Sequence, residues 1–429
     1  MRKVLIIGYL HPLTKPPGGG FALLPLARHL PQFGWQPFVL SPPLREKPDL
    51  QFTVIETPYR DALAFWKRLL RYNPNEGQDL REQVKRQLGV KSKRSLIDFA
   101  FTRGSEIFAY PDVDKGWKPF AINAGKELLQ QENFDAMLSS SPVTSHLIAS
   151  ELKAKYDIPW IAHFPDLWSQ NYNYQYVPFR KFFDRRLELK TLSAVDALVT
   201  ISQPLAEKLR ELHKGKTVYV ITNGFDPAEV NEPPANLTAK FTITYTGTIY
   251  PGKHDATKLF AALRNLISDG AINPEEIEIR FYGPEMGWLD KEIEQYALSH
   301  IVKQYGTIPR QVALEKQRES QILLLLKWED PQERGAYSGK IFEYLAARRP
   351  ILATGGSNSV VTELLQQTKA GIDAPTIPDI KGALEKSYHE YRLKGKIVYD
   401  GRKSEIDKYS HYEMTRKFSE ALNTLVRDV

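Results

Sequence analysis

Short apolar segments, each followed by a glycine-containing loop and then a helix, recur along this chain in two series. In the first series, residues 3–7 form an expected strand, a loop ends in three consecutive glycines, and residues 21–33 form an expected helix. The second series starts with an expected strand at residues 241–245. This alternation is typical of parallel sheets that helices cover on both faces. The sequence therefore predicts an α/β fold with two Rossmann-like domains.

The boundary between the two domains is expected at residues 232–236, a proline-rich stretch that is typical of a linker. We expect an amino-terminal domain at residues 1–232 and a carboxyl-terminal domain at residues 237–408. Residues 409–426 have the apolar stripe of an amphipathic helix. A length of 429 residues also fits two domains better than one.

The composition excludes several classes of protein. The chain has no cysteine, which excludes disulfides, thiolate metal sites and cysteine nucleophiles. The net charge of +7 permits attraction to anions, but the basic residues are dispersed and no nucleic-acid module accompanies them, so we expect no nucleic-acid partner. The apolar run at the amino terminus is too short for a signal peptide, and no segment approaches the roughly 20 apolar residues of a membrane span. We therefore expect a cytoplasmic protein.

The segment GAYSGKIFEYLAARRPILATGG, residues 335–356, carries the strongest functional pattern. Ser338 and Gly339 are expected to start a helix, with the Ser338 side chain capping the first turn. A helix start offers amide groups to an anion, and Lys340 adds a positive charge. Glu343, one turn further on, can accept hydrogen bonds from a ribose diol. The pattern favours a nucleotide site, although a Lys–Glu pair on an ordinary helix surface has the same spacing.

Glycine loops at other expected strand ends add candidate phosphate contacts. They comprise Gly19 and Gly20 before the first helix, Gly247, Thr248 and Lys253 after the strand at residues 241–245, and Gly283 after the expected strand at residues 278–282. Backbone amides in such loops can approach a diphosphate closely. Turns without a ligand and a solvated Lys253 remain the alternatives. The dinucleotide fingerprint is absent, so a nicotinamide enzyme is disfavoured.

The run SGKIFEYLAARRPILATGG resembles the donor-binding segment of retaining family 4 glycosyltransferases with the GT-B fold. It is most similar to the branch that makes bacterial surface and exported polysaccharides. Asp196 and Ser202, the Asn-Gly-Phe-Asp run at residues 223–226, and the Pro-Asp-x-x-x-x-Trp stretch at residues 111–117 resemble further family features. The resemblance implies two facing Rossmann-like domains with the active site between them. It also implies that the tail, residues 409–429, crosses back to the first domain as a helix.

The resemblance assigns Glu343 to the donor ribose and the glycine loops and Lys253 to the donor phosphates. This chain departs from the family at Gly335, where most relatives have a glutamate that contacts the donor sugar. Nucleotide binding therefore carries over better than sugar contact. Three acidic residues close to this position in the sequence are candidates to replace the glutamate: Glu329, Asp330 and Glu333.

A second group of candidates follows an expected strand at residues 159–162, where relatives commonly read Asp-Phe-Arg-Asp-x-Trp. This chain departs from that pattern with His163 in place of the first Asp and Pro165 in place of the Arg, and it matches at Asp166 and Trp168. At a strand end His163 can donate a hydrogen bond to a leaving phosphate or a sugar hydroxyl, and Asp166 can accept one from a hydroxyl, so we expect both to be catalytic. Trp168 and Tyr172 are expected to bind the acceptor sugar by stacking. A His–Asp pair that only orders the loop, and aromatic residues that belong to the core or surface, remain open alternatives.

The resemblance implies transfer of a hexose from a nucleoside diphosphate sugar to a hydroxyl acceptor, with retention and without a metal or other cofactor. The expected acceptor is a polysaccharide or lipid-linked sugar in surface polysaccharide or glycolipid assembly. An amphipathic helix with aromatic and basic residues, expected at residues 61–72, suits peripheral contact with the inner face of the cell membrane. The alternative is a helix that packs its apolar stripe on its own domain. A GT-B nucleotide-sugar epimerase, which needs no acceptor, and a non-catalytic nucleotide-sugar-binding protein are the alternatives.

Overall fold

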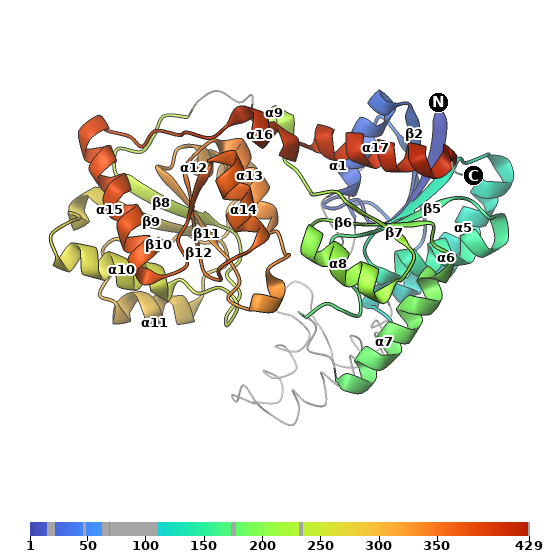
Figure 1. The fold of residues 1–429 in the computed structure, drawn as a ribbon, viewed down its shortest axis with the longest axis horizontal. Helices are drawn as coiled ribbons and strands as arrows, with labels where there is room; N and C mark the ends of the chain where they lie inside the picture. Colours follow the sequence, from blue (N-terminus) through green and yellow to red (C-terminus); the bar gives the residue numbers. More distant parts are fainter. Residues whose placement is uncertain are drawn as a thin grey trace. The chain divides into compact units, whose positions relative to one another are not determined.

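The computed structural model describes residues 1–14, 22–45, 49–61, 68, 110–172, 177–230 and 235–427. It divides into two compact units: the first contains Met1–Thr200, Leu205–Ile221 and Thr415–Val429, and the second contains Ile201–Pro204 and Thr222–Met414. Each unit has one sheet of parallel strands with helices around it (Figure 1). The predicted α/β class is confirmed. Gly19, Gly20 and most of the helix expected at residues 61–72 lie outside the described residues.

The sheet of the first unit has seven strands in the order β3-β2-β1-β4-β5-β6-β7. They are β1 (Arg2–Ile7), β2 (Trp35–Ser41), β3 (Thr53–Glu56), β4 (Ala136–Ser139), β5 (Trp160–Phe164), β6 (Ala197–Thr200) and β7 (Thr217–Val220). The helices described in this unit are α1 (Leu23–His29), η1 (Leu30–Phe33), η3 (Val113–Trp117), α5 (Lys118–Gln131), α6 (Val143–Tyr156), α7 (Pro178–Thr191), η4 (Leu192–Ala194), α8 (Gln203–Leu212) and the main part of α17 (His411–Arg427). The strand order reverses between β1 and β4, which is typical of a doubly wound sheet.

Residues 38–40 predict a short strand that starts at Phe38, after Pro37, but β2 already starts at Trp35 and has Pro37 inside it. β2 pairs with β1 from Trp35 onward, but β3 joins its other side only from Phe38 onward. At Pro37, β2 is therefore still an edge strand, and the missing amide hydrogen has no neighbouring strand to bond. The expected strand start at Phe38 is wrong for this reason.

The sheet of the second unit has six strands in the order β10-β9-β8-β11-β12-β13. They are β8 (Phe241–Thr246), β9 (Ile277–Tyr282), β10 (Val302–Gln304), β11 (Ile322–Leu326), β12 (Ile351–Thr354) and β13 (Gly371–Asp373). The helices described in this unit are α9 (Pro227–Val230), α10 (Thr257–Ser268), η5 (Pro274–Glu276), α11 (Gly287–Gln295), α12 (Arg310–Arg318), η6 (Pro331–Glu333), α13 (Gly339–Ala347), α14 (Val360–Thr368), α15 (Ile377–Lys394), α16 (Lys403–Ile406) and η7 (Asp407–Tyr409). In the parts of both units that are described, no helix is long and apolar enough to cross a membrane.

The packing on both faces of β11 explains why every residue of this strand is apolar. Leu324 and Leu326 pack into a core with α10, α11 and α15, whereas Leu323 and Leu325 pack into a second core with α13 and α14. Successive side chains of a strand point to opposite faces of the sheet. Both faces of β11 are therefore covered, as the continuous apolar run predicts.

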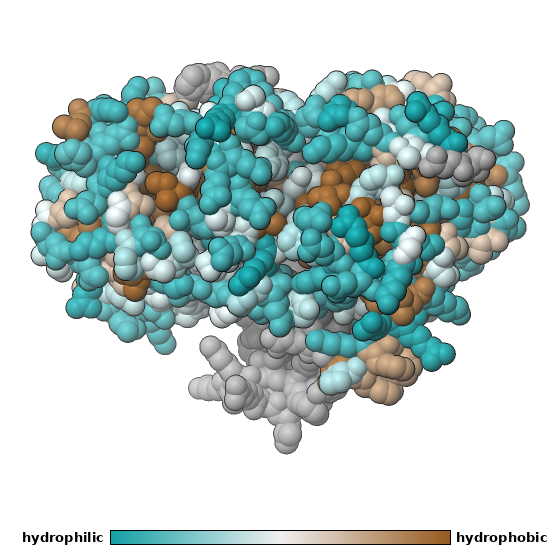
Figure 2. All heavy atoms as spheres, in the orientation of Figure 1, coloured by the Kyte–Doolittle hydropathy of each residue, from teal (hydrophilic) through white to brown (hydrophobic). Residues whose placement is uncertain are grey.

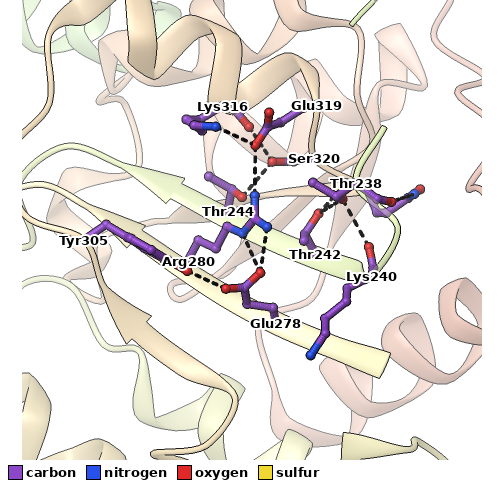
Figure 3. Close-up of polar contacts among 11 residues, drawn as sticks. Thr238, Lys240, Thr242, Thr244, Glu278, Arg280, Tyr305, Lys316, Glu319 and Ser320 are labelled. Atoms are coloured by element: carbon purple, nitrogen blue, oxygen red, sulfur yellow. Dashed lines mark hydrogen bonds and ion pairs between the residues drawn. The ribbon is translucent and has the colours of Figure 1, made fainter. Parts of the chain in front are cut away.

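Strands β8 and β9 alternate instead between apolar and polar residues. Ile243 and Ile279 face the core with α10, and the opposite face carries the polar group drawn in Figure 3. There Arg280 bridges Glu278 at 2.7 Å and Glu319 at 2.9 Å. On this face of β8 and β9 an ion-pair network that includes Glu319, at the end of α12, takes the place of apolar packing.

The Asn-Gly-Phe-Asp run contacts the backbone just before α17. The Phe225 amide donates to Tyr409 O at 2.9 Å, and the His411 amide donates to Phe225 O at 2.8 Å. A Cβ on Gly224 would lie 2.7 Å from Tyr409 O, so only glycine fits here. Helix α17 then ends in the first unit, where Asn423 Oδ1 accepts a hydrogen bond from Arg2 at 3.0 Å.

Candidate functional site

The carboxyl ends of β8 and β9 bring two glycines of the expected donor site together. Gly247 follows β8 with a φ of 110°, and Gly283 follows β9. A Cβ on Gly283 would lie only 2.3 Å from Gly247 O. The loop after Gly247 is held by Tyr245, whose hydroxyl donates to Thr248 O at 2.8 Å. Only glycine permits this approach, so backbone rather than side chains forms this edge of the site.

Lys340 lies directly against Gly247. A Cβ on Gly247 would be 2.5 Å from Lys340 Cε and 2.9 Å from Nζ. Nζ lies 5.3 Å from the centroid of the Tyr245 ring and, within the described residues, makes no hydrogen bond or ion pair. Burial lowers the pKa of Lys340, and the nearby Glu343 carboxylate partly opposes this shift. A partly dehydrated ammonium without an anionic partner has already lost hydration that an anion would otherwise displace.

The amino end of α13 carries no side-chain cap. Ser338 occupies the N-cap position, but its side chain accepts no hydrogen bond from the first turn, so the expected cap is wrong. A Cβ added to Gly339 would meet no atom within 4 Å. The first amide groups of α13 therefore border open space and, together with the helix dipole, favour an anion next to Lys340.

Lys253 and Lys340 both lie close enough to His254 to lower the pKa of its imidazole ring. The pKa of His254 is lowered to about 4, first by burial and then by the positive charges of Lys340 and Lys253. The Trp328 indole donates to His254 Nε2 at 2.9 Å, and Lys253 Nζ lies 4.5 Å from the centroid of a Trp328 ring. The structure thus places both expected phosphate-binding lysines around one neutral, buried histidine.

Two side chains on α12 orient Glu343. Gln317 is fully buried, and its Nε2 donates to Thr246 Oγ1 at 2.9 Å and to Glu343 Oε2 at 3.3 Å. Arg310 Nη2 lies 3.5 Å from Glu343 Oε1 and 2.7 Å from Glu229 Oε1. The Glu343 carboxylate is therefore held from both oxygens, in a position one turn from Lys340.

The sequence pattern did not reveal these two positioning residues. Gln317 precedes Glu343 by 26 positions, and no local spacing connects them. The pairing arises because α12 packs on α13. In the sequence Gln317 is one polar residue of an ordinary polar helix, so nothing there marks it as a partner of Glu343.

The acidic residues near Gly335 are largely engaged elsewhere. Glu329 accepts two hydrogen bonds from Lys258 Nζ, at 2.8 and 2.9 Å. Asp330 caps η6 by accepting from the Gln332 amide at 2.9 Å. Gly335 itself is buried. These contacts give Glu329 and Asp330 structural roles.

His163 is buried within β5 in the first unit. Its ring is 1% exposed, and it contacts the Phe418 ring edge-on at 5.3 Å. Nδ1 lies 3.0 Å from Ser140 Oγ, whereas Nε2 is a buried atom without a partner among the described residues. Burial lowers the pKa of His163 to about 3, so the imidazole is neutral near pH 7. It can share a hydrogen bond but cannot supply a positive charge.

The other candidates of this segment differ in exposure. Asp166 is exposed. Trp168 is only 7% exposed and belongs to the core of the first unit. Tyr172 is 44% exposed, with Lys208 Nζ 4.4 Å from its ring centroid. Of the two aromatic residues, Tyr172 therefore presents the larger surface to a ligand.

Two family-like motifs have structural roles. Asp112 accepts hydrogen bonds from the Thr144 amide at 2.7 Å and from its hydroxyl at 2.6 Å, which anchors the start of α6. Asp196 accepts from the Trp160 amide at 2.7 Å and lies 3.1 Å from Lys153 Nζ. These two carboxylates therefore connect neighbouring strands and helices, which gives both motifs a structural role.

Solved structures with the same architecture identify the fold. The chain is similar to sucrose-phosphate synthase from Thermosynechococcus elongatus, with 13% identity, a TM-score of 0.63 and full coverage of both chains. It is similar to trehalose 6-phosphate synthase from Burkholderia multivorans, with 11% identity, a TM-score of 0.60, and coverage of 100% and 97%. Anabaena HepE in complex with UDP and glucose matches with 12% identity, a TM-score of 0.59, and coverage of 99% and 100%. The fold is GT-B, as the resemblance predicted.

Part of the sequence matches a family model. Residues 18–229 match the model described as Glycosyltransferase Family 4. No curated protein sequence matches the chain. The family match and the shared fold together support a family 4 glycosyltransferase.

Proposed function

We propose that the protein transfers a hexose from a UDP-sugar to a hydroxyl group of a polysaccharide or lipid-linked sugar, with retention of configuration. The observation that carries this proposal is Lys340, a partly buried ammonium without an anionic partner in the described residues, beside the uncapped start of α13 and the Gly247 loop. UDP is the proposed nucleotide because the similar HepE structure contains UDP and glucose.

In the proposed reaction the bond between the anomeric carbon and the diphosphate oxygen breaks, and a bond to the acceptor oxygen forms on the same face of the sugar. The proton of the acceptor hydroxyl passes to the departing diphosphate. The departing diphosphate gains negative charge, which Lys340, Lys253 and the amides of α13 would stabilise. The proposal assigns this role to the lysines and amides rather than to a metal or other cofactor. Glu343, held by Gln317 and Arg310, would accept hydrogen bonds from the ribose diol.

For the acceptor side, we propose Asp166 as the carboxylate that accepts a hydrogen bond from the acceptor hydroxyl. His163 would contribute as a neutral group through Nε2, because burial keeps its imidazole uncharged. Tyr172 is the proposed stacking surface for the acceptor sugar. We propose that the protein takes part in surface polysaccharide or glycolipid assembly at the inner face of the cell membrane.

The test is to incubate the protein with a panel of UDP-sugars, with and without a lipid-linked oligosaccharide acceptor, and to measure UDP release and the fate of the sugar. The proposal requires UDP release that depends on the acceptor and a product whose anomeric configuration matches the donor in its NMR coupling constants. A change of sugar configuration without acceptor would indicate an epimerase. Tight UDP binding without turnover of any donor would indicate a binding protein.

A further inference from the structure

Helix α7 of the first unit has an unusual distribution of side chains. Three polar residues that face the protein are buried, Arg180, Asp184 and Glu188, and Leu187 packs against the core near the carboxyl end. The residues that face solvent include Phe179, which is 72% exposed, and Phe182, which is 59% exposed. An amphipathic helix of a soluble protein normally buries its apolar residues. In the amino-terminal half of α7 the polar side chains are buried and the apolar ones are exposed instead.

The exposed phenyl groups form one cluster. The Phe179 and Phe183 rings lie 4.6 Å apart, and the Phe182 and Phe183 rings lie 5.6 Å apart, both edge-on. Phe183 is 39% exposed. Figure 1 shows α7 along the margin of the first unit, and Figure 2 shows apolar spheres gathered at one end of this helix. Single exposed apolar residues are common on protein surfaces, but three in contact require an explanation.

The charges of the exposed face all have the same sign. Lys181, Arg185, Arg186 and Lys190 are exposed, and within the described part of the chain none of them forms an ion pair. The two acidic residues of α7 point inward instead. Asp184 accepts from Arg180 Nε at 2.7 Å, and Glu188 accepts from the Ser169 amide at 2.9 Å and lies 3.1 Å from His213 Nε2. The outer face of α7 therefore carries four positive charges, three phenyl rings and no negative charge.

We propose that the outer face of α7 docks on an anionic lipid surface. Clustered phenyl rings insert at the boundary between headgroups and acyl chains, while lysine and arginine attract anionic headgroups. A nucleic acid would also attract the positive charges of α7. Proteins that bind single strands, however, place their aromatic rings so that successive bases can stack on them. The rings of α7 contact one another and form a single wedge, which fits a bilayer better.

The inward ion pairs also fit this role. Because Arg180 and Asp184 bond each other and Arg180 Nη2 donates to Pro111 O, α7 is anchored to its own unit through polar contacts. Because these polar contacts fix the position of α7, its phenylalanine side chains can stay exposed to solvent. This inference does not depend on the transferase reaction, because docking can be measured without donor or acceptor.

The experiment is co-sedimentation of the full chain with vesicles of phosphatidylglycerol and phosphatidylcholine in equal parts, and with vesicles of phosphatidylcholine alone. We expect binding to the mixed vesicles that weakens as salt rises, and much weaker binding to the neutral ones. The double variant Arg185→Ser/Arg186→Ser should lower the partition coefficient about 30-fold. The double variant Phe179→Ser/Phe182→Ser should lower it at least about 10-fold.

Matched controls remove similar groups from the second unit. Arg264→Ser/Lys291→Ser removes two exposed charges, and Leu393→Ser removes an apolar side chain that is 70% exposed. Both should bind vesicles like the unmodified protein, and all variants should keep its thermal unfolding midpoint. The proposal fails if the α7 variants bind the mixed vesicles as well as the controls do. It also fails if the unmodified chain ignores anionic vesicles, or if the phenylalanine variant only abolishes self-association in size-exclusion chromatography.

Discussion

Replacing Lys340 with methionine tests the donor site most directly, because methionine keeps much of the apolar stem and removes the charge. In the structure Nζ has no anionic partner among the described residues and has lost part of its hydration. Removing a charged partner from a hydrogen bond costs about 1.5–3 kcal/mol. We therefore expect the Kd for UDP to rise roughly 10- to 150-fold, since about 1.4 kcal/mol corresponds to a tenfold change.

Isothermal titration with UDP and with uridine separates this effect from a general loss of the fold. Lys340→Met should weaken UDP but leave uridine almost unchanged, because uridine has no phosphate. Lys316→Met is the matched control: Lys316 also lies in the second unit, but its Nζ pairs with Glu319 at 3.0 Å. Equal affinity of the unmodified and Lys340→Met proteins for UDP would refute the assignment of the diphosphate to this lysine. A uridine affinity that falls as much as that for UDP would show a disturbed site instead.

Three further predictions concern Gly247, Gln317 and Asp114. Gly247→Ala places a Cβ 2.5 Å from Lys340 Cε at a φ of 110°, so UDP affinity should fall about tenfold in the same titration, and an unchanged affinity would contradict the packing. Gln317→Leu removes a donor to Glu343, so the preference for UDP over its 2′,3′-dideoxy analogue should shrink; a preserved ratio would reject the positioning role. Burial raises the pKa of Asp114 to about 6 from 3.8, so the folded state binds this proton more tightly than the unfolded state, and ionisation destabilises the fold. Asp114→Asn should therefore raise the free energy of unfolding in urea by about 3 kcal/mol at pH 7 and by nearly nothing at pH 4, and a gain independent of pH would contradict this account.

The fold was predictable from sequence because short apolar runs mark buried parallel strands. Residues 322–326 are all apolar, which predicts a strand covered on both faces, and β11 has these bounds and two covered faces. Strand β2 was misplaced because a proline inside a strand is tolerated only where the neighbouring strand is missing. The sequence contains no sign of where β3 starts to pair, so this exception could not be foreseen.

The site was predictable only where its residues are close in sequence. Gly247, Lys340 and Glu343 come from patterns of a few residues, and the structure brings Lys340 against Gly247. Gln317 and Arg310 reach Glu343 through the packing of α12 on α13, which no local pattern encodes. Aromatic residues near a strand end were also ambiguous, because Trp168 belongs to the core whereas Tyr172 is exposed.

The departure at Gly335 has a physical consequence for how the donor is recognised. In the family that the chain resembles, the glutamate at this position contacts the donor sugar, and Gly335 has no side chain to do so. Glu329 is bound twice by Lys258, and Asp330 caps η6, so neither carboxylate is available without breaking a contact. In the proposed donor site, Lys340 is assigned to the phosphate and Glu343 to the ribose, so neither is assigned to the sugar. Most of the binding free energy for the donor should therefore come from its nucleotide part, and selection among sugars must depend on groups other than a carboxylate at this position.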